Sequence, residues 1–60
     1  MLNEEQEVDF CELVGVVVEQ QYGYQDGADL CFNLLEMGTI SEDASIEDAA
    51  QIVAQHMAQA

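Results

Sequence analysis

The run LVGVVV at residues 13–18 decides the fold of this 60-residue chain, because its β-branched residues suit a strand as well as a helix. No second strand-like run exists with which it could pair. Two sets of residues at helical spacing extend on either side of it. The apolar set shares one face: Phe10, Cys11, Leu13, Val14, Val17 and Val18. The acidic set faces the other way, with Val16 among it: Glu5, Asp9, Glu12 and Glu19. We therefore predict a helix over about 4–22, capped by Asn3 and ended by Gly23.

Two further helices are predicted. The second covers about 28–37, between a loop at 22–27 and Gly38, and its apolar face is Leu30, Cys31, Leu34, Leu35 and Met37. A connector at 39–44 follows, in which Ser41 can start a single helical turn. The third covers about 45–59 and begins with SIED at 45–48, which resembles a capping box. Its apolar face is Ile46, Ala49, Ala50, Val53 and Met57. The pattern predicts one all-α domain over 1–60, a small three-helix bundle. Gly15, inside the first helix, is expected to mark close packing.

The charge of the chain has a single sign. Thirteen residues are Asp or Glu and none is Lys or Arg, which gives a net charge of −13. An ordinary protein of this length carries about six or seven basic residues. Thirteen charges equal those on about 22 Å of duplex DNA, close to the expected diameter of the domain, about 25–30 Å. One-signed charge makes a compact state repel itself, so we infer that a function outside stability favours it.

The composition predicts a folded, intracellular protein. Half of the residues are hydrophobic and proline is absent, so the low hydrophobicity typical of disorder is missing. The acidic start at residues 1–5 is unlike a signal peptide, and no apolar run has the length of a membrane span. We expect a cytoplasmic location with reduced thiols. A disulfide between Cys11 and Cys31 stays open if the two face each other.

Several function classes are disfavoured. Binding to nucleic acid needs cations for the phosphates, and the chain has none. An enzyme is not expected, because the single histidine, His56, lies at the edge of an apolar face and both cysteines lie on buried faces. The segment 26–29 (DGAD) lacks the alternating oxygen ligands and the final glutamate of a calcium loop. We expect no cofactor and no specific metal site.

The acidic groups themselves are the candidate site. The stripe on the first helix is about 21 Å long, and two further groups lie at 26–29 and 42–48. An acidic stripe is often no more than a solvated face, but such a face tolerates lysine equally well, and here every cation is absent. Tyr24 is a candidate exposed anchor, Tyr22 is expected to cap the core, and Phe32 lies off the main apolar stripe, where it could meet a partner or a second copy. The candidate partner-binding residues are Glu5, Asp9, Glu12, Glu19, Tyr24, Asp26, Asp29, Glu36, Glu42, Asp43, Glu47 and Asp48.

In size and in its acidic, base-free composition, the whole chain resembles small phage-encoded inhibitors that mimic DNA, including anti-CRISPR and anti-restriction proteins. Such proteins share no fold, so no residue role carries over. The resemblance implies a non-enzymatic inhibitor in the host cytoplasm, whose carboxylates replace phosphates in the groove of a nuclease, a restriction enzyme or a CRISPR complex. The alternatives are an acidic adaptor for a basic protein that does not imitate DNA, a homodimeric module, and adaptation to high salt.

Overall fold

The chain folds into three helices, in the computed structural model that describes residues 2–59. Helix α1 spans Glu4–Tyr22, α2 spans Gly27–Met37 and α3 spans Ile46–Gln59. The described residues contain no strand. The run at 13–18 lies inside α1, which confirms the helical interpretation and the all-α three-helix bundle.

The helix ends follow from local hydrogen bonds. The Asn3 side chain accepts a bond from the Gln6 backbone N–H at 2.8 Å, and the Gln6 side chain accepts one from the Asn3 N–H at 3.0 Å. The expected N-cap is therefore confirmed, and Gln6 completes a capping box. Gly23 and Gly38 end α1 and α2 with φ of 78° and 83°, a conformation in which glycine has no Cβ penalty.

The connections differ slightly from expectation. Helix α2 begins at Gly27, one residue early, after Asp26 with a left-handed φ of 64°. Ser41 starts a turn and no helix: its carbonyl accepts from the Ala44 N–H at 3.0 Å. At the start of α3, the Asp48 N–H donates to the Ser45 hydroxyl at 3.1 Å, which is half of the predicted capping box.

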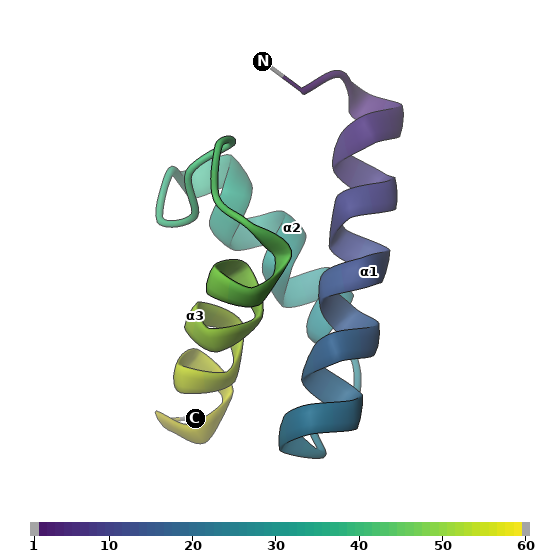
Figure 1. Ribbon diagram of the computed structural model, residues 1–60. Coiled ribbons are helices and arrows are strands. Elements are labelled where there is room, and N and C mark those ends of the chain that lie inside the picture. The colour runs from purple at the N-terminus through teal and green to yellow at the C-terminus, as the bar shows by residue number, and fades with distance from the viewer. Residues whose placement is uncertain (1, 60) are drawn as a thin grey trace.

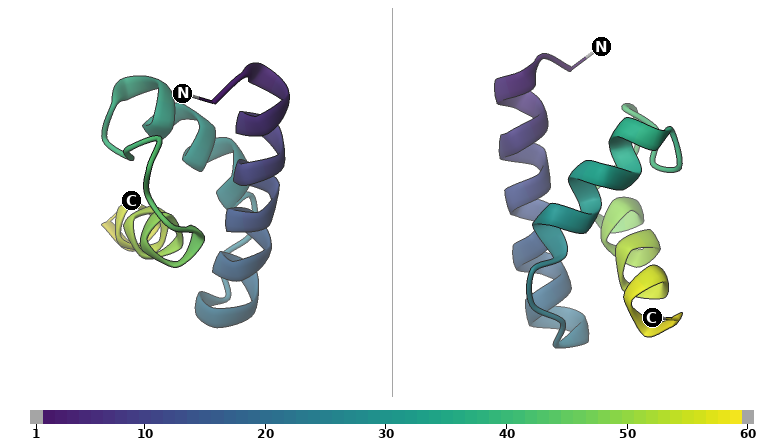
Figure 2. Two further views of the ribbon diagram at one scale, coloured as in Figure 1. Left: turned by 45° about the horizontal axis from the view of Figure 1, so that its top comes forward. Right: turned by 180° about the vertical axis from the view of Figure 1, so that it is seen from behind.

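The helices are arranged around one small core. Figure 1 shows α1 and α3 running in the same direction, with α2 crossing obliquely behind them. Figure 2 shows from behind that α2 lies across both, and all three helices contact one another. The molecule measures 28 × 18 × 16 Å, with a radius of gyration of 10.1 Å.

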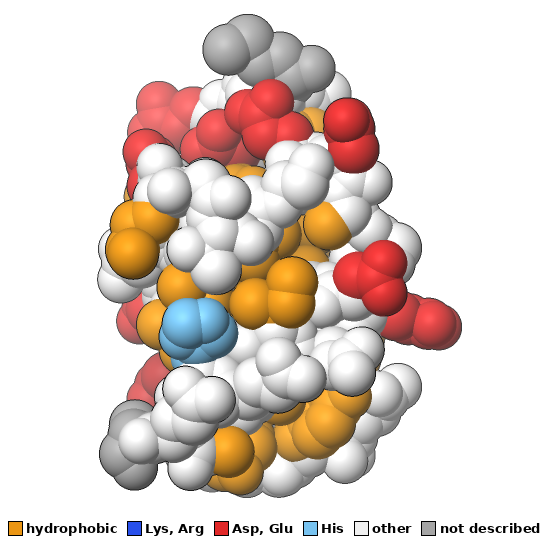
Figure 3. Space-filling model, turned by 90° about the vertical axis from the view of Figure 1, so that its left-hand side faces the viewer, with side chains coloured by type: hydrophobic (Ala, Val, Ile, Leu, Met, Phe, Trp, Pro, Cys, Tyr) orange, Lys and Arg blue, Asp and Glu red, His pale blue; other side chains and the backbone are white. Residues whose placement is uncertain are grey.

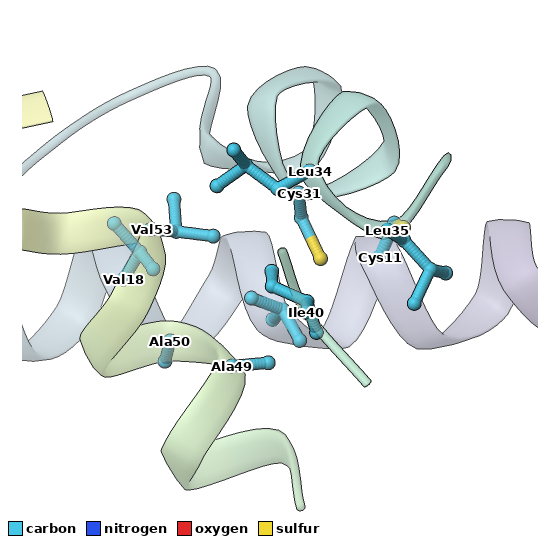
Figure 4. Close-up of a cluster of buried hydrophobic side chains, with 10 residues drawn as sticks. Cys11, Val18, Cys31, Leu34, Leu35, Ile40, Ala49, Ala50 and Val53 are labelled. Atoms are coloured by element: carbon cyan, nitrogen blue, oxygen red, sulfur yellow. The ribbon is translucent and has the colours of Figure 1, made fainter. Parts of the chain in front are cut away.

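The core combines small side chains from all three helices with Ile40 from the second connection (Figure 4). Its alanines let α3 approach closely. The buried hydrophobic residues are Cys11, Val14, Val18, Cys31, Leu34, Leu35, Ile40, Ala49, Ala50, Val53 and Ala54. No buried side-chain N or O atom in the described part of the chain lacks a hydrogen-bond partner. The fold is thus held by apolar burial.

Gly15 marks the closest approach of α1 and α2, as the sequence predicts. A Cβ placed on Gly15 would lie 3.0 Å from both the Cβ and the backbone N of Ala28. Because backbone atoms of a packed helix yield little, only glycine permits this crossing distance. The crossing places the first turn of α2 directly against the middle of α1.

Two residues predicted on the apolar faces are exposed. Leu13 is 53% exposed and Met37 is 73% exposed. Helix α1 buries only the narrow arc of Cys11, Val14 and Val18, and Leu13 lies about 100° away from Val14 around the helix. Met37 is the last residue of α2, directly before the C-cap Gly38.

Candidate protein-binding surface

Acidic side chains cover much of the molecule. All the charged side chains of the chain are carboxylates, and those in residues 2–59 are exposed except for half-buried Glu7. The predicted acidic candidates are therefore accessible to a partner. The exposed set is Glu4, Glu5, Asp9, Glu12, Glu19, Asp26, Asp29, Glu36, Glu42, Asp43, Glu47 and Asp48.

The crossing of α1 and α2 brings five of these carboxylates together. Glu12 is central, because it lines three shallow surface grooves: one with Asp29, one with Glu19 and Asp26, and one with Asp9. The contact between Gly15 and Ala28 is what sets Asp26 and Asp29 beside α1. We call Asp9, Glu12, Glu19, Asp26 and Asp29 the α1–α2 acidic surface.

A second group lies between the last connection and α3. Asp43 and Asp48 line one shallow groove with Gln51 and Gln55. The hydrogen bonds that Ser41 and Ser45 accept from the backbone N–H groups of these two aspartates fix this segment. The remaining candidates are exposed but line none of these grooves: Glu5, Glu36, Glu42 and Glu47. The predicted acidic site thus consists of two groups that line grooves and four exposed carboxylates that do not.

The charge is unevenly distributed. The sequence has no Asp or Glu after Asp48, so most of α3 is neutral. Figure 3 shows this on one face: red carboxylate side chains lie mainly at the top and along the right edge, and only small red areas show at the left edge near His56. A partner attracted by charge would therefore meet the upper end and the α1–α2 side first.

The aromatic residues do not lie as predicted. Tyr24 is half-buried and packs against the core, while Tyr22 is 44% exposed, so their expected roles are reversed. Phe32 is also half-buried against the core and does not project freely. A loop tyrosine after a helix end can fold either way, and here the ring of Tyr24 covers the core beside Gln51 and Ala54.

Two apolar residues lie among the carboxylates of α1. Leu13 and Val16, 53% and 51% exposed, line a shallow groove with Asp9 and Glu12. The sequence placed Val16 on the acidic face but assigned Leu13 to the core. The signal that could have corrected this is Gly15, since a close helix crossing at that point leaves only a narrow arc of α1 buried.

The two cysteines and the single histidine differ in their exposure. Cys11 and Cys31 are buried free thiols; burial raises the pKa of both, that of Cys31 to about 12, where a hydrogen bond with Cys11 adds to the effect. They remain protonated and poorly nucleophilic at neutral pH. His56 is exposed near the end of α3. Residues 2–59 contain no group of three or more side chains suited to hold a metal.

No helix of the described chain has the length and apolar character needed to cross a membrane. No protein-family model, curated protein or solved structure matches the chain. A functional interpretation therefore depends on the surface described above.

Proposed function

We propose that this protein is a non-enzymatic inhibitor that occupies the nucleic-acid-binding surface of a basic protein, with its carboxylates in place of phosphates. The observation that carries the proposal is the exposure of twelve carboxylates on a chain without Lys or Arg. The targets with the fitting chemistry are nucleases, restriction enzymes and CRISPR complexes, as for the acidic phage inhibitors that the composition resembles.

The dimensions of the molecule support this proposal. Its long axis is 28 Å, and thirteen charges on duplex DNA span about 22 Å. The protein therefore offers a linear charge density similar to that of DNA. Opposite charge accelerates the encounter with a basic groove, and salt screens this attraction. We expect the association rate to fall steeply as the salt concentration rises.

The decisive experiment is competition. The immobilised chain is exposed to the heparin-binding proteins of a bacterial lysate, and each retained protein is then challenged with duplex DNA or with polyglutamate of equal charge. An inhibitor that uses the DNA site is displaced by DNA at lower charge concentration than by polyglutamate. A partner that retains the chain in the presence of saturating DNA would instead identify an acidic adaptor and refute the DNA-mimic mechanism.

Matched amide variants test whether a defined surface makes the contact. One variant neutralises three positions of the α1–α2 acidic surface: Asp9→Asn, Glu12→Gln and Asp26→Asn. The control neutralises three exposed positions elsewhere: Glu36→Gln, Glu42→Gln and Asp43→Asn. Both variants carry a net charge of −10, that is −13 plus three. We expect inhibition of the identified target to weaken more in the first, while equal loss would mean that net charge alone decides.

A further inference from the structure

The outer side of α1 carries apolar surface that the fold does not use. Leu13 and Val16 lie one helical turn apart, and each exposes about half of its side chain. Helix α1 forms one edge of the bundle (Figure 2), and the exposure of both side chains shows that the other helices leave them open to solvent. Val14, between them in sequence, is completely buried. A single exposed apolar side chain is common on a protein surface. Two neighbouring ones form a larger apolar patch, which a partner can cover.

Carboxylates border this pair along α1 and on the side towards α2. Asp9 and Glu12 line the groove that contains Leu13 and Val16. On the side towards α2, Glu19 and Asp26 line the adjoining groove, which also contains Val16. The arrangement is an apolar centre with an acidic border, and from Asp9 to Glu19 it extends about 15 Å along α1. We call these six residues the outer patch.

The charge of the border decides what can cover the outer patch. A second copy of the chain would bring its own carboxylates against Asp9 and Glu12, and the chain has no cation to separate them. Nucleic acid and anionic membranes are repelled in the same way. A solvated cationic segment alone would leave Leu13 and Val16 uncovered. The fitting occupant has apolar side chains that cover this pair and cations beside them that reach the carboxylates.

We propose that the outer patch binds a basic amphipathic helix of the target protein. Leucine-like side chains of that helix contact Leu13 and Val16, and its lysines or arginines pair with Asp9, Glu12, Glu19 and Asp26. A length of about 15 Å corresponds to roughly ten residues, or three turns, of the partner helix. This inference rests on the proposed function, because the target surface is a basic one, and it adds which face of the inhibitor makes contact and with what kind of element.

The test uses two synthetic 18-residue peptides of identical leucine and lysine composition. In the first the leucines follow helical spacing and form one face, and in the second they are distributed around the helix. Binding is measured by fluorescence anisotropy in 150 mM salt. We expect the patterned peptide to bind about tenfold more tightly, since burying half of a leucine side chain is worth about one factor of ten.

Variants locate the contact. Leu13→Gln should abolish most of the preference for the patterned peptide, whereas Met37→Gln, which changes the most exposed apolar residue outside the patch, should retain it. NMR shift changes should centre on residues 9–19. Equal binding of the two peptides to the unchanged protein would overturn the proposal, whatever the variants do. So would equal effects of the two substitutions, or concentration-dependent shifts at the patch without peptide, which would assign it to a second copy.

Because the peptide assay contains neither DNA nor a natural target, its result is independent of the DNA competition experiment. A patterned peptide that binds at Leu13, together with a target that DNA fails to displace, would retain the outer patch and reject the DNA mimicry. If the two peptides bind equally and DNA does displace the target, the DNA mimicry is retained and the outer patch is rejected.

Discussion

Helix α1 has two apolar stripes of similar composition and opposite environments. The inner stripe, Cys11, Val14 and Val18, is at most 3% exposed and contacts both other helices. The outer one, Leu13 and Val16, is about half exposed and lies among carboxylates. Hydrophobicity alone therefore does not decide burial in this protein. What decides it is which side of α1 the other two helices occupy.

The adjacent pair Leu13 and Val14 gives the largest expected contrast. Val14→Ala removes buried methyl groups and leaves a small cavity, so we expect a loss of about 2 kcal/mol of unfolding free energy. Leu13→Ala removes more carbon atoms, but from solvent, and should change stability by less than about 0.5 kcal/mol. Urea unfolding followed by circular dichroism measures both. A larger loss for Leu13→Ala than for Val14→Ala would contradict the assignment of the two stripes.

Cys31 of α2, which forms a hydrogen bond with Cys11 of the inner stripe, predicts a response to alkaline pH. The folded state raises the pKa of the Cys31 thiol from 9.0 to about 12, chiefly through burial. The unfolded chain ionises this thiol first, so its contribution to stability is complete below pH 9 and is lost as the pH rises towards 12. At pH 10.5 the loss is roughly 2 kcal/mol.

The measurement for this prediction compares unfolding free energies at pH 8 and pH 10.5 for the unchanged chain and for Cys31→Ala. The substitution lowers stability at both pH values, because it opens a cavity, but it removes the thiol that titrates. The variant should therefore lose less stability on the change of pH. Identical pH dependence in both proteins would show that Cys31 is not the group responsible.

The sequence predicts the bundle well and the surface poorly, for a physical reason. Helix ends depend on local residues, so Asn3, Gly23 and Gly38 were identified correctly. Exposure depends on how much of each helix its neighbours cover, and that follows from crossings such as Gly15 on Ala28. Leu13 is therefore exposed against expectation.

The aromatic and acidic residues show the same dependence on how the helices pack. The orientation of Tyr22 and Tyr24 depends on a loop whose conformation no periodic pattern specifies. The carboxylates were correctly placed on the surface because charge resists burial. Their assembly around Glu12 required the position of α2, which only the folded molecule supplies.

Gly15 separates the two stripes and gives the third prediction. Gly15→Ala improves helix propensity by about 1 kcal/mol, but the new Cβ would meet Ala28 at 3.0 Å. Overpacking of this kind costs about 1–3 kcal/mol, so we expect a net loss of about 1 kcal/mol. Ala28→Gly makes room for the new Cβ. In a double-mutant cycle measured by urea unfolding, the double variant should therefore lose less unfolding free energy than the sum of the two single variants. A Gly15→Ala variant that is more stable than the unchanged protein would mean that α1 and α2 can move apart without loss of stability.

The carboxylates beside the outer stripe provide the smallest effect and the one most dependent on salt concentration. Glu12 lies among four other carboxylates, and like charges one turn apart on a helix destabilise it by about 0.2–0.5 kcal/mol. Glu12→Gln should therefore raise the unfolding free energy by a few tenths of a kcal/mol at 20 mM salt, and this gain should vanish at 500 mM as screening shortens the reach of the charges. Leu13→Ala, which leaves the charge unchanged, is the control and should retain the salt dependence of the unchanged protein. A Glu12→Gln variant that is less stable at low salt would indicate that this carboxylate makes a favourable contact within the fold, and it would weaken the case that the acidic surface exists for a partner.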